Sequence, residues 1–242
     1  MSISVELKGV GRSFGGREVL KGINCAFPEG KISALIGPNG SGKTTMLRIA
    51  ARLEVPGPGS VSYLKGRETV PEDTGLMRSM TLVSQEPLLF NTTLYNNIAY
   101  GLRLRGLTAN TVKDRVEEAL EAGGLSRLAH AHARTLSGGE AQRAAVVRAY
   151  ALRPELVLMD EPTANLDPEG VALVEGLLRR MKEEHGTTAV VVTHNIFQAK
   201  RVSDQVFFLY GGELVETGDN PGFFANPQME LTRRFVTGEV VY

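Results

Sequence analysis

The run Gly-Pro-Asn-Gly-Ser-Gly-Lys-Thr at residues 37–44 constrains the fold of this chain more than any other feature. It follows the apolar residues 32–36, which indicate a buried strand, and it precedes residues 45–50, which indicate a helix. A strand, a Gly-x-x-x-x-Gly-Lys-Thr turn and a helix in this order are typical of a phosphate-binding loop. Glycines let successive backbone N–H groups surround a phosphate, and the helix N-terminus adds the positive end of its dipole. The run therefore predicts a nucleoside triphosphate site.

The last two residues of this run and two acidic residues further along supply the groups that such a site needs. Lys43 provides a positive charge for the β- and γ-phosphates, and the Thr44 hydroxyl is a ligand for Mg²⁺. Asp160 ends a second apolar strand, at residues 156–160, where it would hold the same ion through water. Glu161, one residue further, would activate an attacking water molecule. The simpler interpretation of Asp160 and Glu161 is an acidic pair that faces solvent at a strand end.

A second glycine-containing helix start lies at residues 136–140, Leu-Ser-Gly-Gly-Glu. Ser137 and Glu140 have the spacing of a capping box, which indicates the first turn of a helix. A capping box does not need Gly138 and Gly139, whose missing side chains bare the first-turn N–H groups and create another anion site. One nucleotide per chain cannot fill two phosphate sites. The pattern therefore predicts a head-to-tail dimer, in which each Ser137 helix faces the γ-phosphate held by the other subunit.

Apolar strands alternate with amphipathic helices along most of the chain, which predicts an α/β fold with a mostly parallel sheet. Residues 3–7 alternate apolar with polar, and a Gly-Gly turn at 15–16 precedes a second strand region at 19–27, so we expect an antiparallel β subdomain at the N-terminus. Residues 93–106 and 112–123 have helical patterns, and the helical pattern continues to about residue 152. We expect one domain over residues 1–242, with a core from 1–86 and 151–242 and an inserted helical subdomain over 87–150.

Composition narrows the possible partners. Lys plus Arg and Asp plus Glu both number 27, and this neutral balance argues against bulk binding of nucleic acid. Cys25 is the single cysteine, which excludes an internal disulfide and fits a reducing compartment. The N-terminus lacks the pattern of a signal peptide, and no apolar run approaches the roughly 18 residues that would span a bilayer. We therefore expect a cytoplasmic protein that reaches the inner face of the membrane only through a partner.

With these motifs in this order, the chain resembles the ATP-binding cassette (ABC) family, the ATPase subunits of membrane transporters, over nearly its whole length. Residues 37–44 are similar to its Walker A loop, residues 156–160 to its Walker B strand, and residues 136–140 to the signature motif that separates it from other P-loop proteins. The resemblance implies a RecA-like P-loop core that binds and hydrolyses ATP with Mg²⁺. Small departures, such as Glu140 where the family often has Gln, do not predict a loss of activity.

The resemblance also assigns roles to residues outside these three motifs. Gln85 matches the Q-loop glutamine, which senses Mg²⁺ and the transport subunit, and His194 matches the histidine that contacts the γ-phosphate. Asp167 ends the segment 164–167, which matches the family's D-loop, and Glu161 matches the catalytic glutamate. Phe14 matches the aromatic residue that stacks on adenine, although on its own it would be expected as a core or turn-flanking ring.

Three sets of site residues follow from the motifs and the resemblance together. The expected catalytic residues are Glu161, His194, Lys43 and Gln85. The expected ligands of Mg²⁺ are Thr44, Gln85 and Asp160. The expected ATP contacts are Phe14, Gly37, Pro38, Asn39, Gly40, Ser41, Gly42, Lys43, Thr44, Thr45, Ser137, Gly138, Gly139, Glu140 and Asp167.

Three functions compete at this point. The favoured one is the ATPase of a transporter of the importer type, with a second copy of the chain and membrane permease subunits as direct partners and a solute-binding protein as an indirect one. The second is a soluble cassette ATPase that acts on nucleic acid or ribosomes, but such proteins usually carry two cassettes or a long coiled-coil insertion. The third is a nucleotide-binding regulator without turnover, against which the presence of Glu161 and His194 argues.

The transported solute does not touch this subunit, so the sequence says little about it. Residues 85–106 and 232–239 look similar to importers of tungstate and related oxyanions, with phosphate or polar amino acids as alternatives. The apolar residues 87–90, directly after Gln85, match the groove that receives a helix of the permease in this family. We expect that a charge at Leu89 or Phe90 uncouples transport and spares nucleotide binding; ordinary core packing is the alternative for each side chain.

Overall fold

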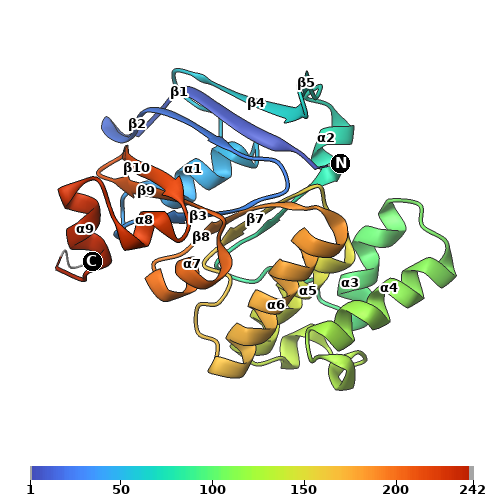
Figure 1. Ribbon diagram of the computed structural model, residues 1–242. Helices are drawn as coiled ribbons and strands as arrows, with labels where there is room; N and C mark the ends of the chain where they lie inside the picture. Colours follow the sequence, from blue (N-terminus) through green and yellow to red (C-terminus); the bar gives the residue numbers. More distant parts are fainter. Residues whose placement is uncertain (1, 240–242) are drawn as a thin grey trace.

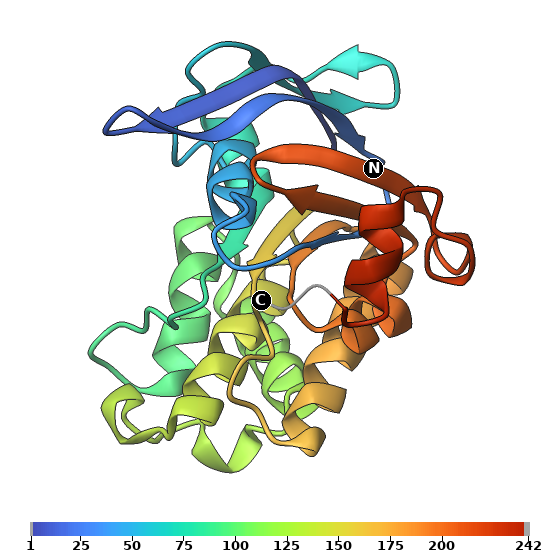
Figure 2. The same ribbon diagram turned by 90° about the vertical axis from the view of Figure 1, so that its left-hand side faces the viewer.

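The computed structural model describes residues 2–239, so residue 1 and residues 240–242 of the expected single domain lie outside the described part. Two β-sheets lie one above the other, and a group of helices extends from one end of the second sheet (Figures 1 and 2). The arrangement confirms the predicted α/β class, with an antiparallel N-terminal sheet, a mostly parallel central sheet and a helical insertion.

The smaller sheet is antiparallel, with strand order β2-β1-β4-β5. Its strands are β1 (Ser4–Phe14), β2 (Arg17–Phe27), β4 (Ser60–Lys65) and β5 (Glu68–Thr69). The predicted turn at Gly15 and Gly16 joins β1 to β2, and both glycines have positive φ, 55° and 80°, which favours residues without a Cβ. The buried residues Val5 and Leu7 alternate with more exposed neighbours, because one face of this sheet is covered and the other is not.

The central sheet has strand order β10-β9-β3-β8-β7-β6, and all of its pairs are parallel except β9 with β10. Its strands are β3 (Ile32–Ile36), β6 (Met80–Val83), β7 (Leu156–Asp160), β8 (Thr188–Val192), β9 (Gln205–Tyr210) and β10 (Glu213–Asp219). Every residue of β3, β7 and β8 is buried, as expected for parallel strands covered on both faces. The carboxyl ends of these three strands meet at one edge of the sheet, and the chain that leaves them carries most of the predicted site.

Helix α1 (Lys43–Ala50) lies between the two sheets, and α2 (Thr74–Ser79) precedes β6 (Figure 2). Met46, Leu47 and Ile49 of α1 share one hydrophobic cluster with residues of β1 and β2 on one side and of β7 and β8 on the other. This cluster fixes the helix that follows the predicted phosphate loop, so the loop is supported from both sheets.

The helical insertion contains α3 (Leu94–Leu104), α4 (Ala109–Ala122) and α5 (Gly138–Ala151), with two single 3₁₀ turns at Ser126–Leu128 and Ala133–Thr135. The expected continuous helical pattern up to residue 152 is therefore wrong between α4 and α5. Gly123 caps α4, and a Cβ there would lie 2.1 Å from Val147 Cγ2 of α5, while Gly124 has a positive φ of 65°. These two glycines end the helix where α5 packs closest to it. The division of the domain at residues 87 and 150 stays a prediction.

The remaining helices cover the face of the central sheet that lies opposite α1. They are α6 (Pro168–His185), α7 (Ile196–Val202), α8 (Gly222–Ala225) and α9 (Glu230–Val236). Phe224 of α8 and Phe235 of α9 pack with Phe208 of β9 in a separate hydrophobic cluster. Within residues 2–239, no helix has the length and apolar character needed to cross a membrane.

Candidate functional site

The loop at residues 37–44 runs from β3 into α1, and two of its glycines are required by what packs against it. Gly37 has φ 151°, and a Cβ on it would lie 2.0 Å from the carbonyl oxygen of Leu209 in β9. Gly42 has φ 104°, and its Cβ would lie 2.7 Å from Leu20 Cδ2 and 2.8 Å from the Val19 carbonyl oxygen in β2. The backbone of the loop therefore packs closely against both the central sheet and the N-terminal sheet, and there is no room for a side chain at these two positions.

Lys43 lies inside this loop and is only 7% exposed. Its Nζ donates hydrogen bonds to the carbonyl oxygens of Gly37, at 2.8 Å, and Pro38, at 2.9 Å. Burial lowers the pKa of the ammonium, and the negative charges of Glu161 and Asp160 oppose that shift. The side chain therefore presents a pre-positioned cation at the place where a phosphate would enter.

Asp160, at the end of β7, lies beside Thr44, at the start of α1. Asp160 is 6% exposed, and burial raises the pKa of its carboxyl, against the opposing effects of a hydrogen bond from Thr44 and the charge of Lys43. Its Oδ1 is buried and has no hydrogen-bond partner within residues 2–239. A buried carboxylate oxygen without a donor is unfavourable, so a cation or its water shell would satisfy it.

These residues fit Mg²⁺. A hydroxyl from Thr44, a carboxylate from Asp160 and an amide from Gln85 are the hard oxygen donors that this ion prefers, and all three residues line one cavity. The described part of the chain holds no cluster of three His, Cys, Asp or Glu residues that would form a site by itself. Mg²⁺ usually keeps several waters and takes part of its ligands from substrate phosphates, so it needs few ligands from the protein.

Glu161 and His194 follow β7 and β8, which are neighbours in the sheet, and they contact each other. Glu161 Oε1 accepts a hydrogen bond from the His194 backbone N–H at 2.9 Å and lies 2.7 Å from His194 Nδ1. Glu161 is 8% exposed, and its backbone has φ 46°, which is uncommon for a residue with a Cβ. Its N–H donates to the Val192 carbonyl oxygen at 2.9 Å, so β8 holds the residue in this conformation.

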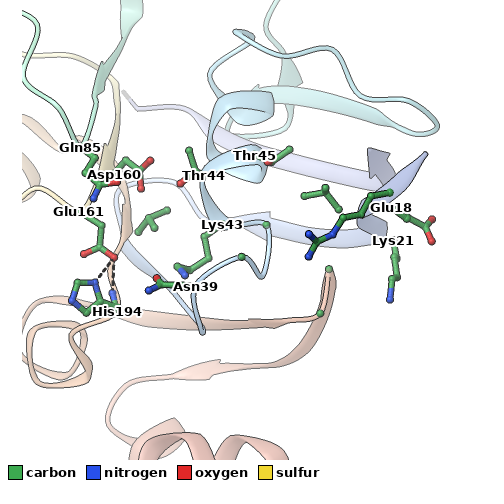
Figure 3. A pocket seen from close by; sticks show the side chains of 17 residues that line it. Glu18, Lys21, Asn39, Lys43, Thr44, Thr45, Gln85, Asp160, Glu161 and His194 are labelled. Atoms are coloured by element: carbon green, nitrogen blue, oxygen red, sulfur yellow. Dashed lines mark hydrogen bonds and ion pairs between the residues drawn. The ribbon is translucent and has the colours of Figure 1, made fainter. Parts of the chain in front are cut away.

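A cavity of about 530 Å³ joins these groups. Figure 3 shows Asp160, Glu161 and His194 at one end, Glu18 and Lys21 at the other, and Lys43 between them. The predicted residues that line it are Asn39, Gly40, Gly42, Lys43, Thr44, Thr45, Gln85, Asp160, Glu161 and His194. Its length and its two chemically different ends suit an elongated anionic ligand such as a nucleotide.

Seven further residues line the cavity that the sequence did not indicate. They are Arg17, Glu18, Val19, Lys21, Val192, Gly211 and Gly212. Gly212 lies in the hairpin turn between β9 and β10, and its N–H donates to the Ser41 carbonyl oxygen at 3.2 Å, while its own carbonyl accepts from the Lys21 N–H at 2.9 Å. The position of this turn against the phosphate loop depends on the packing of the two sheets.

Phe14 is not among the residues that line this cavity. It ends β1, is 45% exposed, and has the Arg12 guanidinium 4.7 Å above its ring. Its partner across the turn is Arg17, which does line the cavity, so Phe14 lies next to the site and not within it. Its role in stacking on adenine stays a prediction. Gly37, Pro38 and Ser41 form the interior of the phosphate loop instead of the cavity wall.

The start of α5 also lies outside the cavity. The predicted capping box is confirmed: the Glu140 N–H donates to Ser137 Oγ at 3.3 Å, and the Ser137 N–H donates to Glu140 Oε2 at 2.7 Å. The Ser137 hydroxyl and the Ser137 backbone N–H each donate to Glu140 Oε2 at 2.7 Å, and these two bonds lower the pKa of the Glu140 carboxyl. A Cβ on Gly138 would meet nothing within 4 Å, so nothing within residues 2–239 requires glycine there. Asp167 likewise caps α6, accepting from the Gly170 N–H at 2.8 Å.

The comparisons with known proteins agree with this geometry. A family model described as "ABC transporter" matches residues 20–164. The chain is 43% identical over 242 residues to "Phosphate import ATP-binding protein PstB" of Pyrobaculum aerophilum, covering 94% of this chain and 95% of that one. It is 40% identical over 254 residues to the protein of the same name from Thermococcus kodakarensis, covering 98% and 99%.

Solved structures give the same result for the fold. CbiO1 of Clostridium perfringens, described as part of the ABC transporter complex cbiONQ, has a TM-score of 0.81 at 27% identity, covering 99% of this chain and 100% of that chain. The ATP-binding cassette MJ0796, solved as a dimer in a post-hydrolysis state bound to ADP and Pi, has a TM-score of 0.80 at 31% identity, covering 90% and 100%.

Proposed function

Because the chain belongs to the ABC transporter family, whose ATP-binding subunits are ATPases, we propose that it drives the import of phosphate through a membrane permease. Its relatives from Pyrobaculum, Thermococcus and Enterococcus are all named as phosphate import proteins, and this supports phosphate over the tungstate expected from the sequence. Phosphate and tungstate are both tetrahedral oxyanions, so the proposed solute stays within the chemical class expected from the sequence.

The observation that carries the hydrolytic part is the buried Glu161 carboxylate, fixed by His194 at one end of the cavity. A general base must be oriented toward the water that it activates, and the bonds from His194 fix one oxygen of the carboxylate. The same contact places the His194 ring at the cavity wall, where it would hold the γ-phosphate. We assign Glu161 as the base and His194 as the γ-phosphate contact.

The remaining residues bind and orient the nucleotide. Lys43 and the backbone N–H groups of the phosphate loop would hold the β- and γ-phosphates in line with the attacking water. Thr44, Asp160 and Gln85 would hold Mg²⁺, which supplies neutralisation of phosphate charge when bound. Phosphoryl transfer needs little else from a protein than positioning and charge stabilisation, and this cavity offers both.

The second half of the site would come from a second copy of the chain. The exposed start of α5, with an open Gly138, lies outside the cavity of its own chain, and MJ0796 forms a dimer in its solved structure. In a head-to-tail dimer, Ser137 and Gly139 of each chain would face the γ-phosphate held by the other. ATP would then close the dimer, and hydrolysis would open it.

The permease would contact the segment after Gln85. Leu88 is 73% exposed and Phe90 is 49% exposed, whereas Leu89 packs against the hydrophobic core, so the exposed pair is Leu88 and Phe90 and not the Leu89 expected from the sequence. Asn97, fully buried, holds this segment: the Phe90 N–H donates to its Oδ1 at 2.7 Å, and its Nδ2 donates to the Phe90 carbonyl at 3.1 Å. Two apolar side chains on a rigid segment beside the catalytic cavity suit a partner helix.

Reconstitution tests this function directly. The chain, assembled with its permease and solute-binding partners in vesicles, should hydrolyse MgATP faster when phosphate is supplied to the solute-binding protein. Tungstate and sulfate at the same concentration are the matched controls. Stimulation by tungstate with no response to phosphate would overturn the proposed solute, and the absence of any solute response in an assembled complex would overturn the transport function.

A further inference from the structure

Gln198, in the first turn of α7, is buried and makes a hydrogen bond to a loop that no motif connects it with. Its side chain is 2% exposed, and Nε2 donates to Thr163 Oγ1 at 2.8 Å. Thr163 lies in the β7–α6 loop, residues 161–167, which begins with Glu161 and ends with the α6 cap Asp167. We infer that Gln198 is a positioning residue for hydrolysis, because it ties this loop to the helix that follows His194.

The position of Gln198 is itself determined by the segment around His194. Asn195 caps α7, accepting from the Gln198 backbone N–H at 3.0 Å, and the Asn195 N–H donates to Thr193 Oγ1 at 3.1 Å. The first turn of α7 therefore moves as a unit with His194. Glu161 and His194 already join the loops after β7 and β8 at one point, and Gln198 with Thr163 joins them at a second point. Two points of attachment fix the orientation of a loop, where one would leave it free to pivot.

The far side of the β7–α6 loop reaches the start of α5. A Cβ on Gly139 would lie 3.5 Å from Leu166 Cδ2 and 3.8 Å from the Asn165 carbonyl oxygen, which is ordinary van der Waals contact. Asn165 has φ 62°, so the loop turns sharply just before this contact. Gly139 thus lies beside a loop whose Thr163 is hydrogen-bonded to Gln198, four residues after His194. This step rests on the proposed dimer, in which Gly139 serves the other subunit's site: Gln198 then sets the distance between the two half-sites of one chain.

The hydrogen bonding of the Gln198 amide indicates that this residue does more than stabilise the fold. Its Oε1 is buried and has no partner within residues 2–239. A buried amide oxygen without a donor is unfavourable, and an apolar side chain of the same length would avoid that cost. The fold would be served as well by methionine at this position, whereas the bond to Thr163 requires an amide.

The test uses the full chain and the steady-state kinetics of its MgATP hydrolysis. Gln198→Met keeps the length of the side chain and removes the bond, so we expect kcat to fall about tenfold, KM for ATP to stay within about twofold, and Tm to stay equal or to rise. Thr163→Val should reproduce the fall in kcat. Thr163→Ser keeps the hydroxyl, so its kcat should stay near that of the wild type. The double variant Gln198→Met/Thr163→Val should lose no more than either single variant, because both remove the same bond.

Ser203→Ala is the matched control. Ser203 is buried near the end of α7 and donates to the Ala199 carbonyl oxygen at 2.7 Å, so its loss weakens the same helix without touching the β7–α6 loop. We expect Ser203→Ala to lower Tm and to leave kcat unchanged. Unchanged kcat in Gln198→Met, losses that add in the double variant, or equal losses in Thr163→Ser and Thr163→Val would each overturn the role of Gln198. The assay contains no transported solute, so these outcomes are independent of whether phosphate import is correct.

Discussion

Adjacent residues at the end of β7 have different environments and different expected roles. Asp160 is the last residue of the strand and lies beside Thr44, and its buried Oδ1 has no hydrogen-bond partner among the described residues. Glu161 leaves the strand with a positive φ, and this turn carries its carboxylate to His194. Two consecutive residues therefore carry carboxylates with different uses: that of Asp160 is suited to a cation, and that of Glu161 is suited to a water molecule. The strained backbone at Glu161 is what makes this difference possible.

At the scale of single residues, we predict that Glu161→Gln strongly lowers the rate of ATP hydrolysis and preserves ATP binding. The amide keeps the shape and the contact with His194 but cannot accept a proton, so the ATPase rate should fall by about 10²–10⁴-fold. Phosphate release measures the rate, and light scattering with MgATP should show an accumulated dimer, because the bound ATP is not hydrolysed. Glu169→Gln, an exposed position in the first turn of α6, is the control and should match wild type. Full ATPase activity in Glu161→Gln would remove Glu161 from the role of base.

Two helices start with glycine-containing sequences, but their glycines are needed for different reasons. At the start of α1, Gly42 is enclosed by β2, so a side chain is excluded by the chain's own fold. At the start of α5, Gly138 has open space around it, so a side chain would be excluded only by something from outside the chain. Gly42 is therefore required by the fold of the chain itself, whereas the fold leaves room for a side chain at position 138.

At the scale of these elements we predict opposite effects of the same substitution. Gly138→Ala should leave the Tm of the monomer unchanged or raise stability by up to about 1 kcal/mol, because alanine favours the helix. It should also prevent the ATP-dependent dimer and so lower ATPase activity. Gly42→Ala should destabilise the monomer by about 1–3 kcal/mol through overpacking against Leu20 and Val19. Thermal melts and gel filtration with and without ATP measure both. An active, dimerising Gly138→Ala variant would contradict the composite site.

The segment before α3 and the segment around α9 lie far apart in the molecule (Figure 1). The exposed residues Leu88 and Phe90 lie before α3, on the side of the helical insertion, while the segment around α9 lies at the opposite end of the molecule (Figure 1). The cavity lies where the chain leaves the carboxyl ends of β3, β7 and β8. A permease seated on Leu88 and Phe90 would therefore be adjacent to Gln85, which lines the cavity, and could sense its state.

At this scale we predict that Phe90→Glu uncouples hydrolysis from transport. Phe90 is half exposed, and its ring packs against the Tyr100 ring in a tilted arrangement with 4.8 Å between the centroids, so the charge should cost little stability, within about 0.5–1 kcal/mol. Phosphate uptake by reconstituted vesicles should fall at least about tenfold, since a buried, unpaired charge at the interface is strongly unfavourable. Met229→Glu, at an exposed position before α9, is the control and should transport normally. Normal uptake by Phe90→Glu would place the permease contact elsewhere.

The sequence by itself determined the fold class, and it predicted a nucleoside triphosphate site that two copies of the chain share. The phosphate loop, the strand-end acids and the capping box before α5 depend on residues close together in the chain, and their chemistry follows from spacing alone. For the same reason the strands and most of the helices were predictable from periodicity. The interruption between α4 and α5 was not, because Gly123 ends the helix through its close approach to Val147.

Only the tertiary structure decided which side chains share the site. It placed Lys21 and Gly212 on the cavity wall and Phe14 beside it, because the packing of the two sheets around α1 sets these distances. It turned Leu89 into the core and left Leu88 exposed, and it joined Gln198 to Thr163 across 35 residues of sequence. Such contacts depend on how whole helices and strands are arranged in space, and a local sequence pattern cannot predict that arrangement.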